Sequence, residues 1–226
     1  MPAWEFICSP KHLLVNIKNS INKGIMNFLS IDCSTDIGLL FVKIKSKTFT
    51  VNLQSDKYNN DLLMKNILIF LKKNNINFSN IDKIFVNQGP GNFSGLRGSI
   101  AIAKGIGIAQ NIDIVGYNTF ILMCASYLKK KKNIYSIIKF REKYFIKKFD
   151  SNLKSLSKIK EVHKADLLVK YKNKLIVTPN NLIKYIDKKI LKINNLVAVD
   201  LDYNMLEFLG FEALLDKNLI KPIYLS

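Results

Sequence analysis

Apolar residues occur in short runs along residues 28–128, and these runs predict strands that alternate with helices. Runs bounded by turn residues predict strands at 28–33, 38–44, 48–53, 81–87 and 112–117. Apolar residues three and four positions apart predict helices around 62–71, 94–110 and 120–128. Three consecutive strands followed by helix–strand crossovers predict a mixed sheet with helices packed on it.

The same order of elements occurs in the ribonuclease-H-like half of proteins of the actin and sugar-kinase class, so we expect an actin-like α/β fold. The second half is less regular, with strands expected at 134–139, 144–149, 157–162, 175–178 and 196–199 and helices at 182–190 and 205–209. One interpretation is a second, shortened copy of the same topology, although no sequence repeat is visible. We therefore expect an N-terminal subdomain over 26–117 and a reduced second subdomain over 118–226.

Residues 1–25 differ in pattern from the rest of the chain. Four apolar residues in this segment have helical spacing: Leu13, Leu14, Ile17 and Ile21. The segment has no continuous apolar run of signal-peptide length, and its lack of arginine is a poor match to a transit peptide. We expect it to be an extra N-terminal segment that is disordered, or that is not translated because synthesis starts at Met26.

Composition limits the class of protein. The chain has 226 residues, of which 48% are hydrophobic, so a disordered protein is excluded. No stretch reaches the roughly 18 uncharged apolar residues that a membrane span needs, so we expect no membrane partner. Cys8, Cys33 and Cys124 are too few and too scattered for a disulfide framework, and no CxxC pair suggests a zinc site. We expect a cytoplasmic protein with no metal and no cofactor.

The net charge of +18 has two explanations. A strongly basic chain often binds nucleic acid. However, the chain has 33 lysines against 2 arginines, together with 25 asparagines and 31 isoleucines against 8 alanines. Lysine, asparagine and isoleucine are encoded by A/T-rich codons, so the excess also reflects genome composition. The charge alone does not decide between codon bias and a selected basic surface.

A glycine-rich loop lies between a predicted strand and a predicted helix, at Gly89, Gly91 and Gly95. Such loops can present backbone N–H groups to a phosphate. No Gly-Lys-Ser/Thr follows, so the loop is not a Walker A motif, and the dinucleotide GxGxxG register is absent. Phosphate binding is therefore a minor alternative. We expect Ser94 to cap the following helix.

The helix after this loop has an unusual number of small residues. Each glycine inside a helix costs about 1 kcal/mol relative to alanine, so their repetition indicates close approach of another backbone. That backbone belongs either to the chain's own sheet or to a partner chain. Arg97 is one of two arginines in a lysine-rich chain, which indicates that a carboxylate, backbone carbonyls or a phosphate requires its planar fork of donors.

Three motifs resemble the TsaB family. They are Ile31-Asp32-Cys33-Ser34-Thr35, the run from Gln88 to Arg97 (QGPGNFSGLR), and Ala103-Lys104-Gly105. The closing Lys221-Pro222-Ile223-Tyr224-Leu225 is similar to the family's Pro-x-Tyr-Leu end. The resemblance is strong over about residues 28–125 and thin beyond them. The chain departs from the family at residues 58–64, where the usual His-Ser pair is replaced.

The resemblance implies a non-catalytic protein that pairs with TsaD, the enzyme that transfers the threonylcarbamoyl group to adenosine in tRNA. It also implies an assembly with the ATPase TsaE, contact with tRNA through that complex, and a homodimer when TsaB is alone. The expected partner-interface residues are Leu62, Leu63, Ile67, Phe93, Leu96, Arg97, Gly98, Ala101 and Gly105. The residues expected to shape the loops are Asp32, Ser34, Thr35, Gly89, Pro90, Gly91, Ser94 and Gly95, with the Asp32 carboxylate bound to backbone rather than to metal.

Other functions stay open as alternatives. An independent actin-like ATPase or kinase would need a second glycine-rich phosphate loop, but only Gly116 and Gly210 occur after residue 111. A metallopeptidase is disfavoured because His12 and His163 are isolated, and a nucleophilic Cys33 has no histidine nearby in the expected fold. A direct tRNA-binding module is the non-enzymatic alternative, although no known nucleic-acid motif is present.

Overall fold

The computed structural model describes residues 24–53, 60–127, 133–215 and 220–225. The predictions made for the N-terminal segment fall almost entirely on residues outside these ranges.

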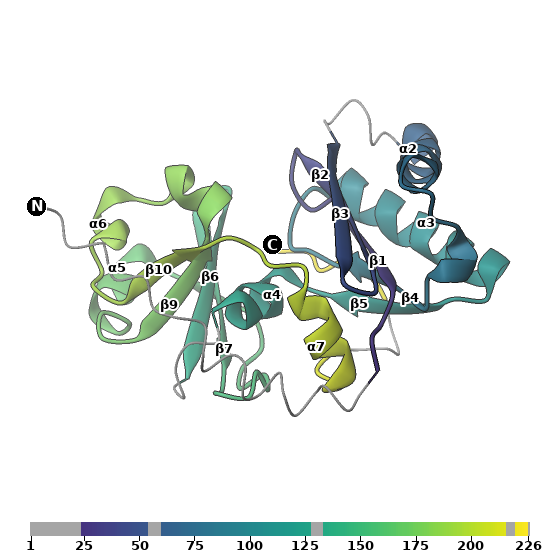
Figure 1. Cartoon of the computed structure of the whole chain (residues 1–226). Helices are drawn as coiled ribbons and strands as arrows, with labels where there is room; N and C mark the ends of the chain where they lie inside the picture. Colours follow the sequence, from purple (N-terminus) through teal and green to yellow (C-terminus); the bar gives the residue numbers. More distant parts are fainter. Residues whose placement is uncertain (1–23, 54–59, 128–132, 216–219, 226) are drawn as a thin grey trace, which may run out of the picture.

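The first half of the chain forms a five-stranded mixed sheet (Figure 1). Its strands are β1 (Phe28–Asp32), β2 (Gly38–Ile44), β3 (Lys47–Leu53), β4 (Lys83–Asn87) and β5 (Asp113–Tyr117), in the order β3-β2-β1-β4-β5. Strands β1, β2 and β3 are antiparallel neighbours, whereas β4 and β5 run parallel to β1. The predicted order of strands and helices is confirmed.

Two long helices cover one face of this sheet (Figure 1). They are α2 (Asn60–Lys73) and α3 (Phe93–Gln110), and a short 3-10 helix η3 (Phe78–Asn80) follows α2. Apolar residues from alternate positions of the central strands meet the inner faces of both helices and form a buried core. The prediction that Ser94 caps α3 is wrong, because Asn92 is the N-cap and its side chain accepts a hydrogen bond from Gly95 N at 3.1 Å. Ser94 is exposed within the first turn.

The second half repeats the topology of the first. Its strands are β6 (Ile134–Phe140), β7 (Lys143–Phe149), β8 (Lys160–Val162), β9 (Leu175–Pro179) and β10 (Leu196–Val199). Strand β6 pairs antiparallel with β7, which pairs antiparallel with β8, while β9 runs parallel to both β6 and β10. The order β8-β7-β6-β9-β10 is therefore that of the first sheet, and the interpretation as a second copy of the topology is confirmed.

The helices of this second copy are short. They are α5 (Lys164–Val169), the 3-10 helix η4 (Asn180–Tyr185) and α6 (Lys188–Leu191). The single helix predicted over 182–190 is wrong, because Ile186 is extended and Asp187 starts a new helix by capping Lys189 N. Helix α5 was not predicted, since its six residues carry too short an apolar pattern.

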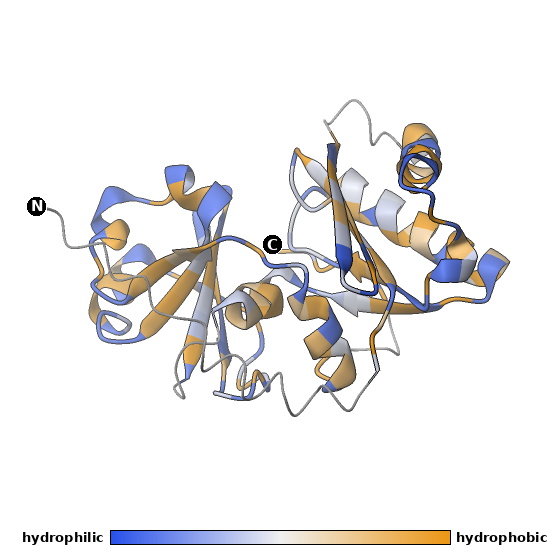
Figure 2. Ribbon diagram, in the orientation of Figure 1, coloured by the Kyte–Doolittle hydropathy of each residue, from blue (hydrophilic) through white to orange (hydrophobic). Residues whose placement is uncertain are grey.

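Two further helices, α4 (Thr119–Ser126) and α7 (Met205–Phe211), lie between the two sheets (Figure 1). Helix α4 leaves the first sheet but packs on β6, β7 and β9 of the second. Helix α7 leaves the second sheet, contacts α4, and lies against Phe85 of the first. Their apolar residues join strand residues of both sheets in one core, and Figure 2 shows the hydrophobic residues that run along these strands. A domain boundary at residue 117 stays a prediction.

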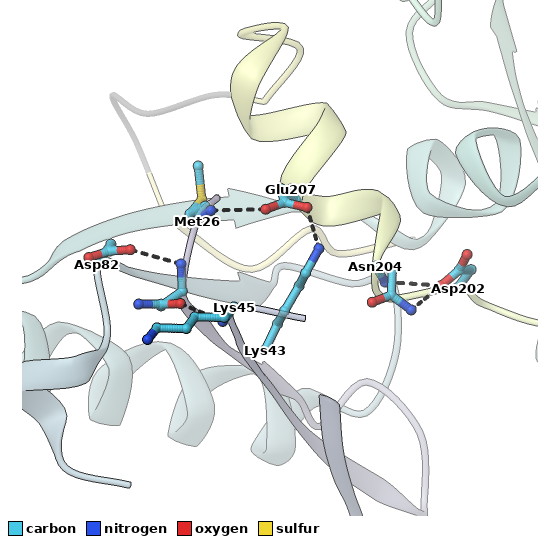
Figure 3. Close-up of polar contacts among 8 residues, drawn as sticks. Met26, Lys43, Lys45, Asp82, Asp202, Asn204 and Glu207 are labelled. Carbon is cyan, nitrogen blue, oxygen red and sulfur yellow. Dashed lines mark hydrogen bonds and ion pairs between the residues drawn. The ribbon is translucent and has the colours of Figure 1, made fainter. Parts of the chain in front are cut away.

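Polar contacts also hold α7 to the first half (Figure 3). The Glu207 carboxylate of α7 accepts a hydrogen bond from Met26 N at 2.9 Å and forms an ion pair with Lys43 of β2. We call these three residues the Glu207 junction. Both charged side chains of the junction are more than four-fifths buried. Within the described parts of the chain, no helix is long and apolar enough to cross a membrane.

Candidate protein-interaction surface

The turn after β1 and the glycine-rich loop, which carry two of the recognised motifs, pack against each other. Two glycines of the loop have the closest approach. A Cβ added at Gly91 would lie 1.9 Å from the Ser34 carbonyl oxygen, and one added at Gly95 would lie 2.3 Å from the Cys33 carbonyl oxygen. Asn92 N also donates to the Ser34 carbonyl oxygen at 2.8 Å. These two glycines are therefore explained by contacts within the chain.

Three backbone donors of this loop are already used. Gly89 N donates to Asn87 Oδ1 at 2.8 Å, while the N–H groups of Asn92 and Gly95 are bound as described above. Gly89 has φ +102° and, like Pro90, is buried. A phosphate needs several free N–H groups that point to one place. The N–H groups of Gly89, Asn92 and Gly95 are unavailable for this role, which counts against the phosphate alternative.

Asp32 is a buried carboxylate surrounded by neutral donors. Its Oδ1 accepts from Ser34 N at 2.9 Å and from Ser34 Oγ at 2.6 Å. Its Oδ2 accepts from Asn87 Nδ2 at 2.8 Å and from the hydroxyls of Tyr203 at 2.9 Å and Tyr117 at 3.3 Å. Five donors therefore satisfy the charge without a cation.

This environment changes the titration of the neighbouring groups. Burial raises the pKa of the Tyr117 and Tyr203 hydroxyls, and the nearby Asp32 charge raises both further. Burial also raises the pKa of the Cys33 thiol, with a smaller contribution from Asp32. A thiol that stays protonated is a poor nucleophile, and the only described histidine, His163, lies exposed at the start of α5. These observations do not support the alternative of a Cys33 nucleophile.

The actin-like fold raises the question of ATP, which such proteins bind between their halves. A cavity of about 210 Å³ lies there. Its lining includes Asp32, Ser34, Thr35, Pro90 and Thr119, together with Tyr203 and other residues of the second half. Among the residues that the structure describes, no lysine or arginine lines this cavity. The hydroxyl of Tyr203, which belongs to the second half, also donates a hydrogen bond to the Asp32 carboxylate. The residues present do not fit a triphosphate.

Metal ligands are equally scattered. Across the described ranges, no group of three or more His, Cys, Asp or Glu residues could hold a metal ion. Thr35 is partly exposed and its hydroxyl donates to the Ile37 carbonyl oxygen at 2.7 Å. The polar side chains of the turn, Asp32, Ser34 and Thr35, are therefore all hydrogen-bonded within the chain.

The residues predicted to contact a partner divide into two groups. Leu63, Ile67, Leu96 and Gly98 are buried within this chain. Leu62, Phe93, Arg97, Ala101 and Gly105 are exposed on the outer faces of α2 and α3. The buried group packs between the helices and the sheet, so only the exposed group is available to a partner. An interface role stays a prediction for all nine.

The small residues of α3 divide between the two interpretations of the helix, packing on the chain's own sheet and contact with a partner chain. A Cβ at Gly107 would lie 2.6 Å from the Ile114 side chain, so this glycine is required by the chain's own sheet. A Cβ at Gly105 would have no atom within 4 Å. No described residue requires a glycine at 105, where helix propensity disfavours it.

Other exposed apolar side chains lie on α2 and α3, and the sequence analysis assigned three of them no interface role. Ile108 of α3 is 85% exposed, while Leu68 and Ile69 of α2 are 48% and 53% exposed. Leu68 also borders an open groove of about 530 Å³ at the end of α2, with Leu71, Ile76 and Phe78. Helical spacing could have placed Ile69 and Leu62 on one outer face, because they are seven residues apart. We call Leu62, Leu68, Ile69, Ala101, Gly105 and Ile108 the α2/α3 face.

Comparisons with known proteins agree with the motifs. A family model described as "TsaD: tRNA N6-adenosine threonylcarbamoyltransferase" matches residues 54–138. A curated relative from Buchnera aphidicola subsp. Baizongia pistaciae (strain Bp), "tRNA threonylcarbamoyladenosine biosynthesis protein TsaB", is 30% identical over 92 residues. The match covers 39% of this chain and 42% of that relative, so the chain spans less than half the length of the relative it matches.

Two solved structures from Pseudomonas aeruginosa have the same fold. "YeaZ from Pseudomonas aeruginosa" has a TM-score of 0.68 at 14% identity, and a protein "with similarity to peptidase YEAZ" has a TM-score of 0.65 at 13% identity. Each comparison covers 89% of this chain and 100% of the other.

The sequence matches are partial, whereas the likeness to the two solved structures shows a shared fold over most of the chain. The actin-like fold of the YeaZ structures extends over both halves of this chain, including the second half in which the motifs were thin.

Proposed function

We propose that this chain acts in the biosynthesis of threonylcarbamoyladenosine in tRNA, as a non-catalytic subunit that binds TsaD and holds it in its active assembly with TsaE. The observation that carries the proposal is Gly105. This glycine faces open space on the exposed side of α3, which also carries Ala101 and Ile108, although helix propensity disfavours a glycine there. Close approach of a partner helix would explain it.

The rest of the α2/α3 face suits a protein partner. Its apolar residues are interleaved with exposed lysines of α2, namely Lys65, Lys72 and Lys73. An apolar centre with a charged surround is the usual anatomy of a protein interface. The partner surface should therefore be apolar with acidic residues around it. The same face would mediate a homodimer when TsaD is absent.

The non-catalytic part of the proposal rests on the cleft. Asp32 is satisfied by neutral donors, the cavity beside it has no basic residue, and the Cys33 thiol is buried. None of these groups is arranged for proton transfer, nucleophilic attack or phosphate binding.

Co-purification with the TsaD of the same organism tests the proposal. Gly105→Leu should leave the circular dichroism melt normal, because a Cβ at this exposed position has no described atom within 4 Å. It should weaken the complex roughly 5- to 150-fold, since overpacking costs about 1–3 kcal/mol and each 1.4 kcal/mol is a tenfold change.

A matched pair of surface variants distinguishes binding through a specific face from non-specific hydrophobic binding. Ile69→Glu places a charge in the α2/α3 face, whereas Val169→Glu does the same at an exposed apolar residue of α5 that is 77% exposed. We expect only Ile69→Glu to reduce TsaD binding. Equal binding by wild type, Ile69→Glu and Gly105→Leu would refute this interface.

A further inference from the structure

An aromatic stack lies at the start of α3, beside the last described segment of the chain. The rings of Phe93 and Tyr224 stack with centroids 5.2 Å apart and planes at 30°. The guanidinium carbon of Arg97 lies over the Phe93 ring, 5.1 Å from its centroid. We call Phe93, Arg97 and Tyr224 the aromatic stack.

The stack is exposed. Phe93 keeps 54% and Tyr224 keeps 55% of their surface accessible, and Arg97 is also exposed. Two large rings left in water at one place are uncommon unless they serve binding. The sequence predicted that Arg97 meets a carboxylate, a carbonyl or a phosphate. Among the described residues its guanidinium instead lies over a ring, with a planar shape that the compact ammonium of a lysine lacks.

Tyr224 is held in place by the segment that carries it. Ile223 N donates to the Gln88 carbonyl oxygen at 2.7 Å, and Gln88 Nε2 donates to the Lys221 carbonyl oxygen at 3.0 Å. Ile220 is 9% exposed and belongs to the core beneath α3. The segment 220–225 lies between the two halves (Figure 1). The ring of Tyr224 is therefore pre-positioned, which lowers the entropy lost on binding.

The segments that carry the stack contain basic residues and no acidic ones. No aspartate or glutamate occurs from Lys83 to Ile112, nor in residues 220–225. Arg97, Lys104 and Lys221 supply positive charge in these segments. A ligand that combines a flat ring with a negative charge fits this surface.

We propose that the aromatic stack binds an unpaired base of a single-stranded RNA, with the neighbouring phosphates near Arg97 and Lys221. Unpaired bases stack on aromatic rings and on guanidinium planes, and positive charge beside the rings attracts the backbone. The choice of RNA over single-stranded DNA rests on the proposed function. About 12 residues of α3 separate Phe93 from Gly105, or roughly 18 Å at 1.5 Å per residue, so RNA at the stack and a protein on the α2/α3 face would lie side by side.

The test uses the full chain and a short single-stranded RNA that carries one fluorescent adenine analogue. Wild type should bind the RNA and quench the analogue, because the base stacks. Tyr224→Ala should weaken binding roughly 5- to 150-fold, the range expected for loss of about 1–3 kcal/mol per stacked base. Tyr224→Phe keeps the ring and should bind within about twofold of wild type. Arg97→Ala should lower the slope of log affinity against log salt by about 1.

Tyr185→Ala is the matched control. Tyr185 is also 54% exposed and has Lys184 over its ring at 4.9 Å, but it lies in the second half. Its removal should leave RNA binding unchanged. Circular dichroism of each variant verifies the fold, and Tyr224→Phe with Arg97→Lys tests the stack through conservative changes if Tyr224→Ala does not fold.

Three results would overturn the proposal. The first is wild-type affinity for RNA in Tyr224→Ala. The second is an equal loss of RNA affinity in Tyr185→Ala and Tyr224→Ala. The third is a Tyr224→Ala variant that loses TsaD binding but keeps RNA binding. If single-stranded DNA of the same sequence binds with equal affinity, the stacking site is supported but its preference for RNA is refuted. The co-purification of wild type with TsaD is measured separately, so failure of the proposed function is distinguishable from failure of the RNA site.

Discussion

Removal of the Glu207 carboxylate should loosen the contact between α7 and the first half. Glu207→Ala deletes both bonds of the Glu207 junction and leaves the Lys43 ammonium, whose side chain is 17% exposed, without its partner. Breaking a fully buried ion pair from one side costs about 3–5 kcal/mol. Partial exposure reduces that cost, and the lost hydrogen bond to Met26 N adds about 1 kcal/mol.

The expected loss of unfolding free energy is therefore about 2–4 kcal/mol. For a chain of this size that corresponds to a fall in Tm of roughly 4–16 °C. Urea denaturation followed by circular dichroism measures it. The double variant Lys43→Met/Glu207→Ala should be more stable than the sum of the single losses predicts, by about 1–3 kcal/mol, because the second change removes the stranded charge.

An exposed ion pair provides the control. Lys170 and Asp166 form an i,i+4 pair on α5 at 2.9 Å, with the lysine side chain 69% exposed. Lys170→Ala should leave the denaturation midpoint unchanged, because exposed pairs contribute little. If Glu207→Ala is as stable as Lys170→Ala, or if the two junction residues show no coupling, the junction does not stabilise the attachment of α7.

Two further predictions concern buried thiols and glycines. In a Cys8→Ser variant at pH 8, Cys33 and Cys124 should resist a thiol reagent until the chain unfolds. Burial raises the pKa of both thiols, that of Cys124 to about 12. Rapid labelling of the folded chain would contradict this burial. Gly91→Ala should destabilise the fold, because its Cβ would lie 1.9 Å from a carbonyl oxygen, whereas Gly105→Ala should stabilise α3 by up to about 1 kcal/mol. Thermal melts measure both effects, and a higher Tm for Gly91→Ala than for Gly105→Ala would contradict the packing described.

The sequence predicted the first half well because local pattern and tertiary environment agree there. The central strand β1 is buried at every position, so its apolar run is unambiguous. The start of α3 was misplaced by one residue because Asn92 and Ser94 are both good caps, and only the backbone conformation at Asn92 decides between them.

The second half was harder to predict because its elements are short. Helices of four to six residues carry little periodicity, and the extended Ile186 between η4 and α6 has no sequence signal. The contact between Tyr203 and Asp32 joins residues 171 positions apart, which no local pattern reveals. The Phe93–Tyr224 stack was missed for the same reason.

The two copies of the topology provide an internal comparison that bears on the α2/α3 face. Both sheets have five strands in the same order, so they need similar cover on their outer faces. The second sheet is covered by α5 with 6 residues, η4 with 6 and α6 with 4, whereas the first carries α2 with 14 and α3 with 18. Covering a five-stranded sheet therefore does not require helices as long as those of the first half. The outer faces of these long helices expose Ile69 and Ile108 to solvent, which lowers solubility and adds nothing to the core. A partner that buries these residues would account for the long helices, for their exposed apolar side chains and for Gly105 together.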